Sequence, residues 1–185
     1  MRYGFVVLCA VVLVVGASPV GATAGSSGWM HCGGLSGTAR LSPGLPQAGR
    51  TDLVVPTVSI NDAKLSGCSG SVKTGTASGS LKFARPLNCT SLIDKITANV
   101  PLNAEGTMRI VWNTHRTSTV ALKFGFGAVH DQPALAAVTG TVTAGQFKGQ
   151  KASGDVLWAL GPTECFGGAP LTSVTFHLYT LTATK

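Results

Sequence analysis

Residues 106–127, GTMRIVWNTHRTSTVALKFGFG, decide the fold class. Large apolar residues alternate with polar or small ones on both sides of a short polar segment, NTHR at 113–116. The apolar positions are Met108, Ile110 and Trp112 before that segment, and Val120, Leu122, Phe124 and Phe126 after it. Period-2 alternation around a short turn is typical of two antiparallel strands with one buried face. The stretch therefore predicts a β-hairpin that turns Trp112 and Phe124 toward a core.

Comparable stretches recur on both sides of this hairpin. Alternation and abundant Val and Thr predict further strands at 35–41, 53–65, 76–84, 138–147, 152–160 and 172–182. Pro56 and the polar pair Asn61-Asp62 make the second of these irregular, which indicates a bulge or an edge position. Residues 42–49, SPGLPQAG, are a predicted loop, and residues 91–96 are a predicted single helical turn.

The strand count and composition point to one architecture. Only 11% of residues are charged, 44% are hydrophobic and 24 are glycine, which suits strands joined by tight turns. About eight strands that meander in sequence order expose two edges unless the sheet closes on itself. We therefore predict an all-β fold with one antiparallel domain at residues 25–185. An up-and-down β-barrel is favoured, and a two-sheet β-sandwich is the alternative.

The first 24 residues have the pattern of a signal peptide. A single Arg2 precedes an apolar run at 5–15 that is too short to cross a bilayer, and Ala22-Thr23-Ala24 matches a cleavage site. We expect the mature chain to begin at Gly25 and to be exported, either outside the cell or to the cell envelope. No later stretch is apolar enough to span a membrane.

Cleavage would remove Cys9 and leave four cysteines: Cys32, Cys68, Cys89 and Cys165. An even number in an exported chain predicts two disulfides, for which three connectivities exist. If eight strands run up and down in order, Cys32 and Cys68 lie at one end of the barrel. Cys89 and Cys165 then lie at the other end. Because the Cα atoms of a cystine lie within about 7 Å, we predict Cys32–Cys68 and Cys89–Cys165.

Several segments together resemble a known group of sequences. They are the cysteine framework and SPGLP (42–46), LSGC (65–68), NCTSL (88–92), VWN (111–113), TSTV (117–120), GTVTAGQFKG (140–149) and LTS (171–173). The chain resembles an uncharacterised family of small secreted β-rich proteins of unknown function from actinomycete-type bacteria. The resemblance implies a bacterial origin, export, two disulfides and an all-β fold, and it assigns no catalytic residue. The turn around Gly149 also resembles turns in closed barrels of the allene-oxide-cyclase and dirigent type.

No catalytic, cofactor or metal constellation emerges from the sequence. Glu105 and Glu164 fall near strand ends on one side and could face each other as a glycosidase pair does. His130 and Asp131 are adjacent, but no G-x-S-x-G motif accompanies them. The other three histidines, His31, His115 and His177, fall at different predicted ends and faces. We therefore expect a protein that is not an enzyme, and a hydrolase is the less favoured reading.

Charge suggests a binding role. The formal net charge is +7, and the basic residues stand singly without a basic stripe interleaved with aromatics, so we expect no nucleic-acid partner. The lead hypothesis is a non-enzymatic binding or interaction module for anionic envelope glycan, lipid or another protein. The alternative is a carrier that holds a small apolar ligand inside the barrel. A binding site is expected around Cys89 and Cys165.

Aromatic residues add a weaker suggestion. Trp29, Trp112, Trp158, Phe166 and Tyr179 could line a sugar- or lipid-binding surface. Trp112 and Trp158 sit on faces that alternate with polar residues, so we expect them in the core. Tyr179 shares a strand face with His177, opposite Val174, Phe176 and Leu178, and is expected to be exposed.

Overall fold

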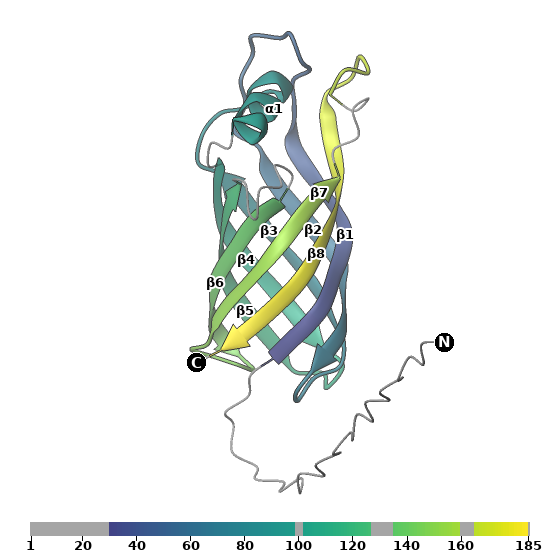
Figure 1. Ribbon diagram of the computed structural model, residues 1–185, viewed down its shortest axis with the longest axis vertical. Coiled ribbons are helices and arrows are strands. Elements are labelled where there is room, and N and C mark those ends of the chain that lie inside the picture. The colour runs from purple at the N-terminus through teal and green to yellow at the C-terminus, as the bar shows by residue number, and fades with distance from the viewer. Residues whose placement is uncertain (1–29, 99–101, 127–134, 160–164, 185) are drawn as a thin grey trace, which may run out of the picture.

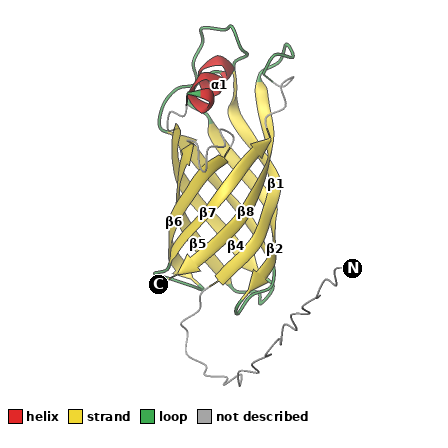
Figure 2. Cartoon of the chain, viewed as in Figure 1, coloured by secondary structure: helices red, strands yellow, loops and turns green. Residues whose placement is uncertain are grey.

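The computed structural model describes residues 30–98, 102–126, 135–159 and 165–184. They form one closed barrel of eight antiparallel strands in sequence order, with a short helix over one end (Figures 1 and 2). The elements are β1 (Met30–Leu45), β2 (Thr57–Ser69), β3 (Gly75–Phe83), α1 (Cys89–Thr97), β4 (Leu102–Trp112), β5 (Thr117–Phe126), β6 (Leu135–Gly145), β7 (Lys151–Ala159) and β8 (Leu171–Thr184). The prediction of an eight-stranded barrel is confirmed, and the sandwich alternative is not the fold.

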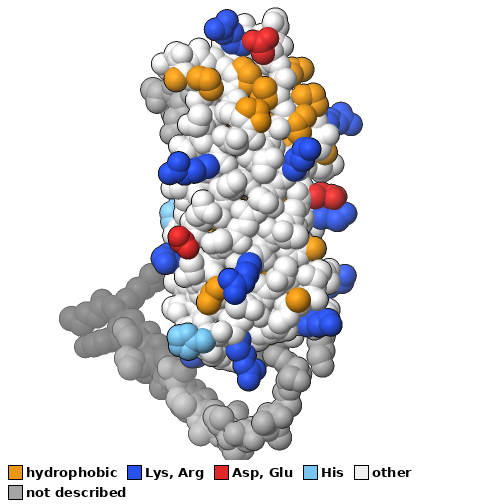
Figure 3. Space-filling view, turned by 180° about the vertical axis from the view of Figure 1, so that it is seen from behind, with side chains coloured by type: hydrophobic (Ala, Val, Ile, Leu, Met, Phe, Trp, Pro, Cys, Tyr) orange, Lys and Arg blue, Asp and Glu red, His pale blue; other side chains and the backbone are white. Residues whose placement is uncertain are grey.

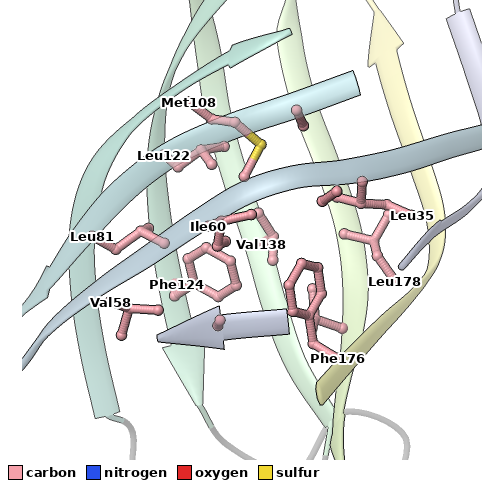
Figure 4. Close-up of a cluster of buried hydrophobic side chains, with 14 of the residues drawn as sticks. Leu35, Val58, Ile60, Leu81, Met108, Leu122, Phe124, Val138, Phe176 and Leu178 are labelled. Carbon is pink, nitrogen blue, oxygen red and sulfur yellow. The ribbon is translucent and has the colours of Figure 1, made fainter. Parts of the chain in front are cut away.

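The core fills the barrel because apolar residues alternate along each strand. In β4, Met108, Ile110 and Trp112 are buried, whereas Thr107 and Arg109 are exposed. The predicted inward faces of the hairpin are therefore confirmed. Side chains from opposite walls meet in the interior, as Figure 4 shows for Leu35, Val58, Ile60, Leu81, Met108, Leu122, Phe124, Val138, Phe176 and Leu178.

Inward-facing glycines let neighbouring strands approach closely. Gly79 on β3 and Gly106 on β4 are nearby in the β3–β4 ladder. A Cβ on Gly79 would overlap the carbonyl oxygen of Thr107, and one on Gly106 would overlap that of Ser80. Only glycine fits at such points, so these residues allow the sheet to bend into a closed barrel.

Strand boundaries differ from the prediction, most of all in β1 and β2, and β1 begins at Met30, five residues earlier than predicted. The predicted loop at 42–45 belongs to β1, because the register of β1 against β8 shifts between Arg40 and Leu45. Beyond the shift, Leu45 pairs with Leu171. Pro43 lies within the shifted segment, where its missing N–H breaks no hydrogen bond of the β1–β8 ladder. β2 lies four residues later than predicted at both ends, since it runs to Ser69.

Two irregular segments were predicted more closely. The register of β2 against β3 shifts between Ile60 and Ala63, so the bulge lies at Asn61-Asp62 as expected. The helical segment is longer than the single predicted turn, because α1 has nine residues.

No helix among the described residues combines the length and apolar character needed to cross a bilayer. The predicted signal peptide, 1–24, lies outside the described residues.

The two ends of the barrel differ in their connections. We call the end with three short connections, at 70–74, 113–116 and 146–150, the turn end. We call the end that carries α1 the loop end (Figure 1). Cys32 lies directly opposite Cys68 near the turn end, and the two form a disulfide. Cys89 of α1 is joined to Cys165 at the loop end. Both predicted pairings are confirmed, and disulfides suit an oxidising compartment.

Candidate functional site

Three turns at the turn end are joined by hydrogen bonds into one surface, which we call the turn platform (70–74, 113–116 and 146–150). The side-chain oxygen of Asn113 accepts from the backbone N–H of Lys73 at 2.9 Å. Gln146 donates from Nε2 to Ser71 Oγ at 3.2 Å, and its Oε1 accepts from Thr114 Oγ1 at 3.4 Å. Each of the three turns is therefore tied to at least one other, so they hold fixed positions relative to one another.

A buried cluster supports the platform from inside the barrel. Trp112 Nε1 donates to Ser118 Oγ at 2.8 Å, and Ser118 Oγ donates to the carbonyl of Gln146 at 2.6 Å. The Phe147 ring meets the Trp112 ring edge to face, with centroids 5.6 Å apart. Phe147 has a positive φ of 68°, which places this side chain within the turn. Trp112 and Ser118 are 2% and 1% exposed, so their side chains fill this end of the barrel interior.

The platform carries positive charge and no acidic residue. Its cations are Lys73, Arg116 and Lys148, and all three are exposed. Exposed His115 lies beside Arg116. Figure 3 shows Lys and Arg side chains around this end on the visible face, while the acidic side chains lie higher. The one ion pair among the described residues, Lys123 with Glu105, is on the barrel wall.

The described connections at the loop end also carry acidic residues. Residues 46–56, 84–98 and 165–170 contain three cations and two acids, for a formal net charge of +1. The three turns of the platform contain three cations and no acid, for a formal net charge of +3. Both ends therefore carry three cations, and the difference in net charge comes from the acids, which the three short turns lack. Strand order and the acid-free turns could together have predicted this.

The loop end is built as a cap over the barrel. Asn88 accepts from the N–H of Ser91 at 2.8 Å and so caps the N-terminus of α1. Its Nδ2 donates to the carbonyl of Arg50 at 2.7 Å, and Thr90 Oγ1 accepts from Gly49 N at 2.9 Å. Asn88 is 6% exposed, and its buried side chain is engaged in the helix cap and in the contact with Arg50.

Apolar side chains are exposed near this cap. Leu53 is 53% exposed, Val55 is 37% exposed and Phe166 is 66% exposed. Leu53 and Val55 flank Val54, which forms an isolated β-bridge with Leu87. The binding site predicted near Cys89 and Cys165 would fall here, and what the structure places here is an apolar surface with little net charge.

The barrel interior is closely packed. Its cavity has a volume of about 40 Å³ and is lined by apolar side chains with Ser118 as the one polar residue among those described. Pockets that bind drug-sized molecules have roughly 300–1,000 Å³. The hydroxyl of Ser118 already bonds to Trp112 and to the Gln146 carbonyl. The carrier alternative therefore has no matching cavity in the described part of the chain.

A larger hollow lies on the outer wall of the barrel. It has a volume of about 610 Å³ and crosses β4, β5 and β6 as far as the start of β7. We call it the wall groove, and it is lined by Glu105, Gly106, Thr107, Ala121, Leu122, Lys123, Thr139, Gly140, Thr141 and Lys151. Sequence reasoning did not identify this groove, because small outward residues on three strands form it only once the strands pair.

The residues considered for catalysis do not converge in the described part of the chain. Glu105 is exposed and paired with Lys123 at 3.1 Å. Glu164, His130 and Asp131 lie outside the described residues. His115 is in a turn and His177 is on β8. No group of three or more His, Cys, Asp or Glu residues that could hold a metal occurs among the described residues.

The predicted positions of the aromatic residues are confirmed where the structure describes them. Trp112 is buried as predicted, and Tyr179 is 56% exposed as predicted. Val174, Phe176 and Leu178, on the opposite face of β8, are buried. Trp29 and the side chain of Trp158 lie outside the described part of the structure. The exposed aromatics Phe166 and Tyr179 come from a loop and a strand wall.

Comparison with protein-family models, with curated proteins and with solved structures finds no match.

Proposed function

We propose that this protein is an exported, non-enzymatic binding module that uses its turn platform to hold an anionic ligand at the cell envelope. The observation that carries the proposal is the charge of the platform. Lys73, Arg116 and Lys148 are exposed on hydrogen-bonded turns that contain no acid. The proposal places the site at the turn end, whereas the sequence alone favoured the loop end.

Rigidity supports binding here as much as charge does. The turns are held by the side chains of Asn113 and Gln146, and the buried Trp112–Ser118 pair supports them. A preformed surface loses little conformational freedom when a ligand binds, so more of the attraction appears as affinity. Because the three exposed cations lie on turns at one end of the barrel, each adds to a positive potential that attracts an anionic surface.

The two alternative functions have less support. A carrier needs an interior far larger than the observed cavity of about 40 Å³. A hydrolase needs converging acid, base or nucleophile groups, and Glu105 is instead exposed on the wall and paired with Lys123. The proposal therefore rests on surface recognition.

The test compares two triple variants of the disulfide-bonded protein. In the platform variant, Lys73→Gln, Arg116→Gln and Lys148→Gln remove three charges from the turn end. In the matched control, Lys82→Gln, Arg85→Gln and Lys95→Gln remove three charges near the loop end. Binding to dextran sulfate, to neutral dextran and to vesicles of anionic or zwitterionic lipid is measured at rising NaCl.

We expect salt-sensitive binding to an anionic probe and none to the neutral probes. A cation near an anionic surface contributes about 1 kcal/mol, so the platform variant should bind about a hundredfold more weakly. The control should bind within about threefold of the parent protein. Equal weakening in both variants, or binding that salt does not change, would contradict the proposal.

A further inference from the structure

We propose that the ligand is an extended acidic glycan chain that runs from the turn platform into the wall groove. This inference rests on the proposed function and adds the ligand class and a second contact surface. It is carried by the groove's shape, by the hydroxyl groups along it and by its position next to the platform.

The wall groove has an ordered floor. Strand register places Lys151, Thr141, Ala121 and Thr107 in one row across β7, β6, β5 and β4. The next row toward the loop end contains Thr139, Lys123 and Glu105. Short side chains in the first row make the hollow, and longer charged side chains border it. The groove therefore crosses strands, as a site for an extended chain does.

The groove offers the groups that bind a hydroxylated anion. Thr107, Thr139 and Thr141 present hydroxyls that donate and accept hydrogen bonds. Lys151 Nζ donates to Thr141 Oγ1 at 3.1 Å, so a cation and a hydroxyl lie side by side. Glu105, at the far border, is an acceptor for sugar hydroxyls and pairs with Lys123. This mixture suits a chain with many hydroxyls and some acidic groups.

The groove begins where the platform ends. Lys151 is the first residue of β7 and directly follows the turn at 146–150, which carries Lys148. On β4, exposed Arg109 lies between the Thr107 position and the turn that carries Arg116. Cations therefore follow both sides of the path from platform to groove.

Geometry separates a glycan from a bilayer. The platform covers an end of the barrel, and the groove lies on its side wall. A planar bilayer that rests on the barrel end cannot also enter a groove across the side strands. A flexible chain can bend over the rim and occupy both surfaces. Glycan recognition thus uses every feature described, and bilayer recognition uses the platform alone.

The test uses dextran sulfate fragments of increasing length on the disulfide-bonded protein. The groove variant is Thr139→Val with Thr141→Val, which removes two hydroxyls and keeps the β-branched shape. The matched control is Thr38→Val with Thr175→Val, a directly paired and exposed threonine couple on β1 and β8. Thermal unfolding of each variant verifies that the barrel is intact.

We expect affinity to rise with fragment length, and the groove variant to bind the long fragments roughly tenfold more weakly because two hydrogen bonds are lost. For the shortest fragments that bind, the groove variant should have the same affinity as the parent protein. The control variant should have the parent affinity for fragments of every length. The platform variant should weaken binding of all fragments.

The outcomes distinguish this inference from the proposed function. If the platform variant loses binding and the groove variant does not, the protein binds anions but not an extended glycan in the groove. The inference of a glycan in the groove also fails if anionic vesicles bind as tightly as long dextran sulfate and only the platform variant weakens vesicle binding. If no anionic probe binds, the proposed function fails as well.

Discussion

The two ends of this barrel close the same cylinder in different ways. At the turn end, three connections of four or five residues meet over buried Trp112 and partly buried Phe147, and they expose cations and polar groups. At the loop end, long connections and α1 are held by a disulfide and a helix cap, and they expose apolar side chains. Connection length therefore decides what each end can present.

Short turns give rigidity at low entropic cost, and they leave room only for a few side chains directed outward. Long connections can carry a helix and an apolar surface, but they need cross-links to remain ordered. The turn end is thus suited to recognise charge, and the loop end is stabilised mainly by its own internal bonds.

The disulfides should stabilise the ends unequally. The chain-entropy relation gives about 4.5 kcal/mol for Cys89–Cys165, which are 76 residues apart, and about 3.8 kcal/mol for Cys32–Cys68, which are 36 apart. The variant with Cys89→Ser and Cys165→Ser should therefore lose more stability in urea unfolding. Its hydrogen exchange should accelerate first in α1.

The variant with Cys32→Ser and Cys68→Ser provides the comparison, because that cystine links residues already paired in the β1–β2 ladder. Its exchange should accelerate without a preference for α1. If both double variants loosen α1 equally, the loop end does not depend on its own cross-link.

The next largest effect should come from the polar cluster beneath the platform. Ser118→Ala removes the partner of Trp112 Nε1 and of the Gln146 carbonyl, both at the closed turn end. Loss of a buried hydrogen-bond partner costs about 1–3 kcal/mol. Urea unfolding should report this loss, and the exposed control Ser80→Ala should change stability by less than about 0.5 kcal/mol. An unchanged midpoint for Ser118→Ala would show that the turn end does not need this cluster.

The barrel could be predicted from sequence because its main determinant is local. Alternation in β4 and β5 predicts which side chains face inward, and the meander then places Cys32 with Cys68. Strand boundaries were harder to predict where strand pairing holds residues that are typical of turns. Residues 42–45 look like a loop, yet a shift in register keeps Leu45 in β1 opposite Leu171.

The candidate site was not predictable in the same way. Lys73, Arg116 and Lys148 are isolated in sequence, and only strand order brings their turns to one end. The hydrogen bonds of Gln146 to Ser71 and Thr114 join segments up to 75 residues apart, so no local pattern reports them. The wall groove likewise depends on which outward residues are paired across β4, β5 and β6.

The helix cap at the loop end should contribute less than the turn-end cluster. Asn88→Ala removes the acceptor for Ser91 N and should cost about 1 kcal/mol. Asn88→Ser keeps an oxygen acceptor for the helix cap and loses the donor to the Arg50 carbonyl, so it should cost less. Urea unfolding measures both. A cost for Asn88→Ser equal to that for Asn88→Ala would assign the role of Asn88 to its contact with Arg50.

The smallest effect is expected for the apolar surface of the loop end. Leu53→Ser combined with Phe166→Ser replaces two side chains that are 53% and 66% exposed. Because both already contact water over much of their surface, stability should change by less than about 0.5 kcal/mol. Dextran sulfate binding should also be unchanged, since the proposed site lies at the opposite end. Weaker binding in this variant, with stability retained, would give the loop end a part in recognition and would remove the functional difference between the two ends.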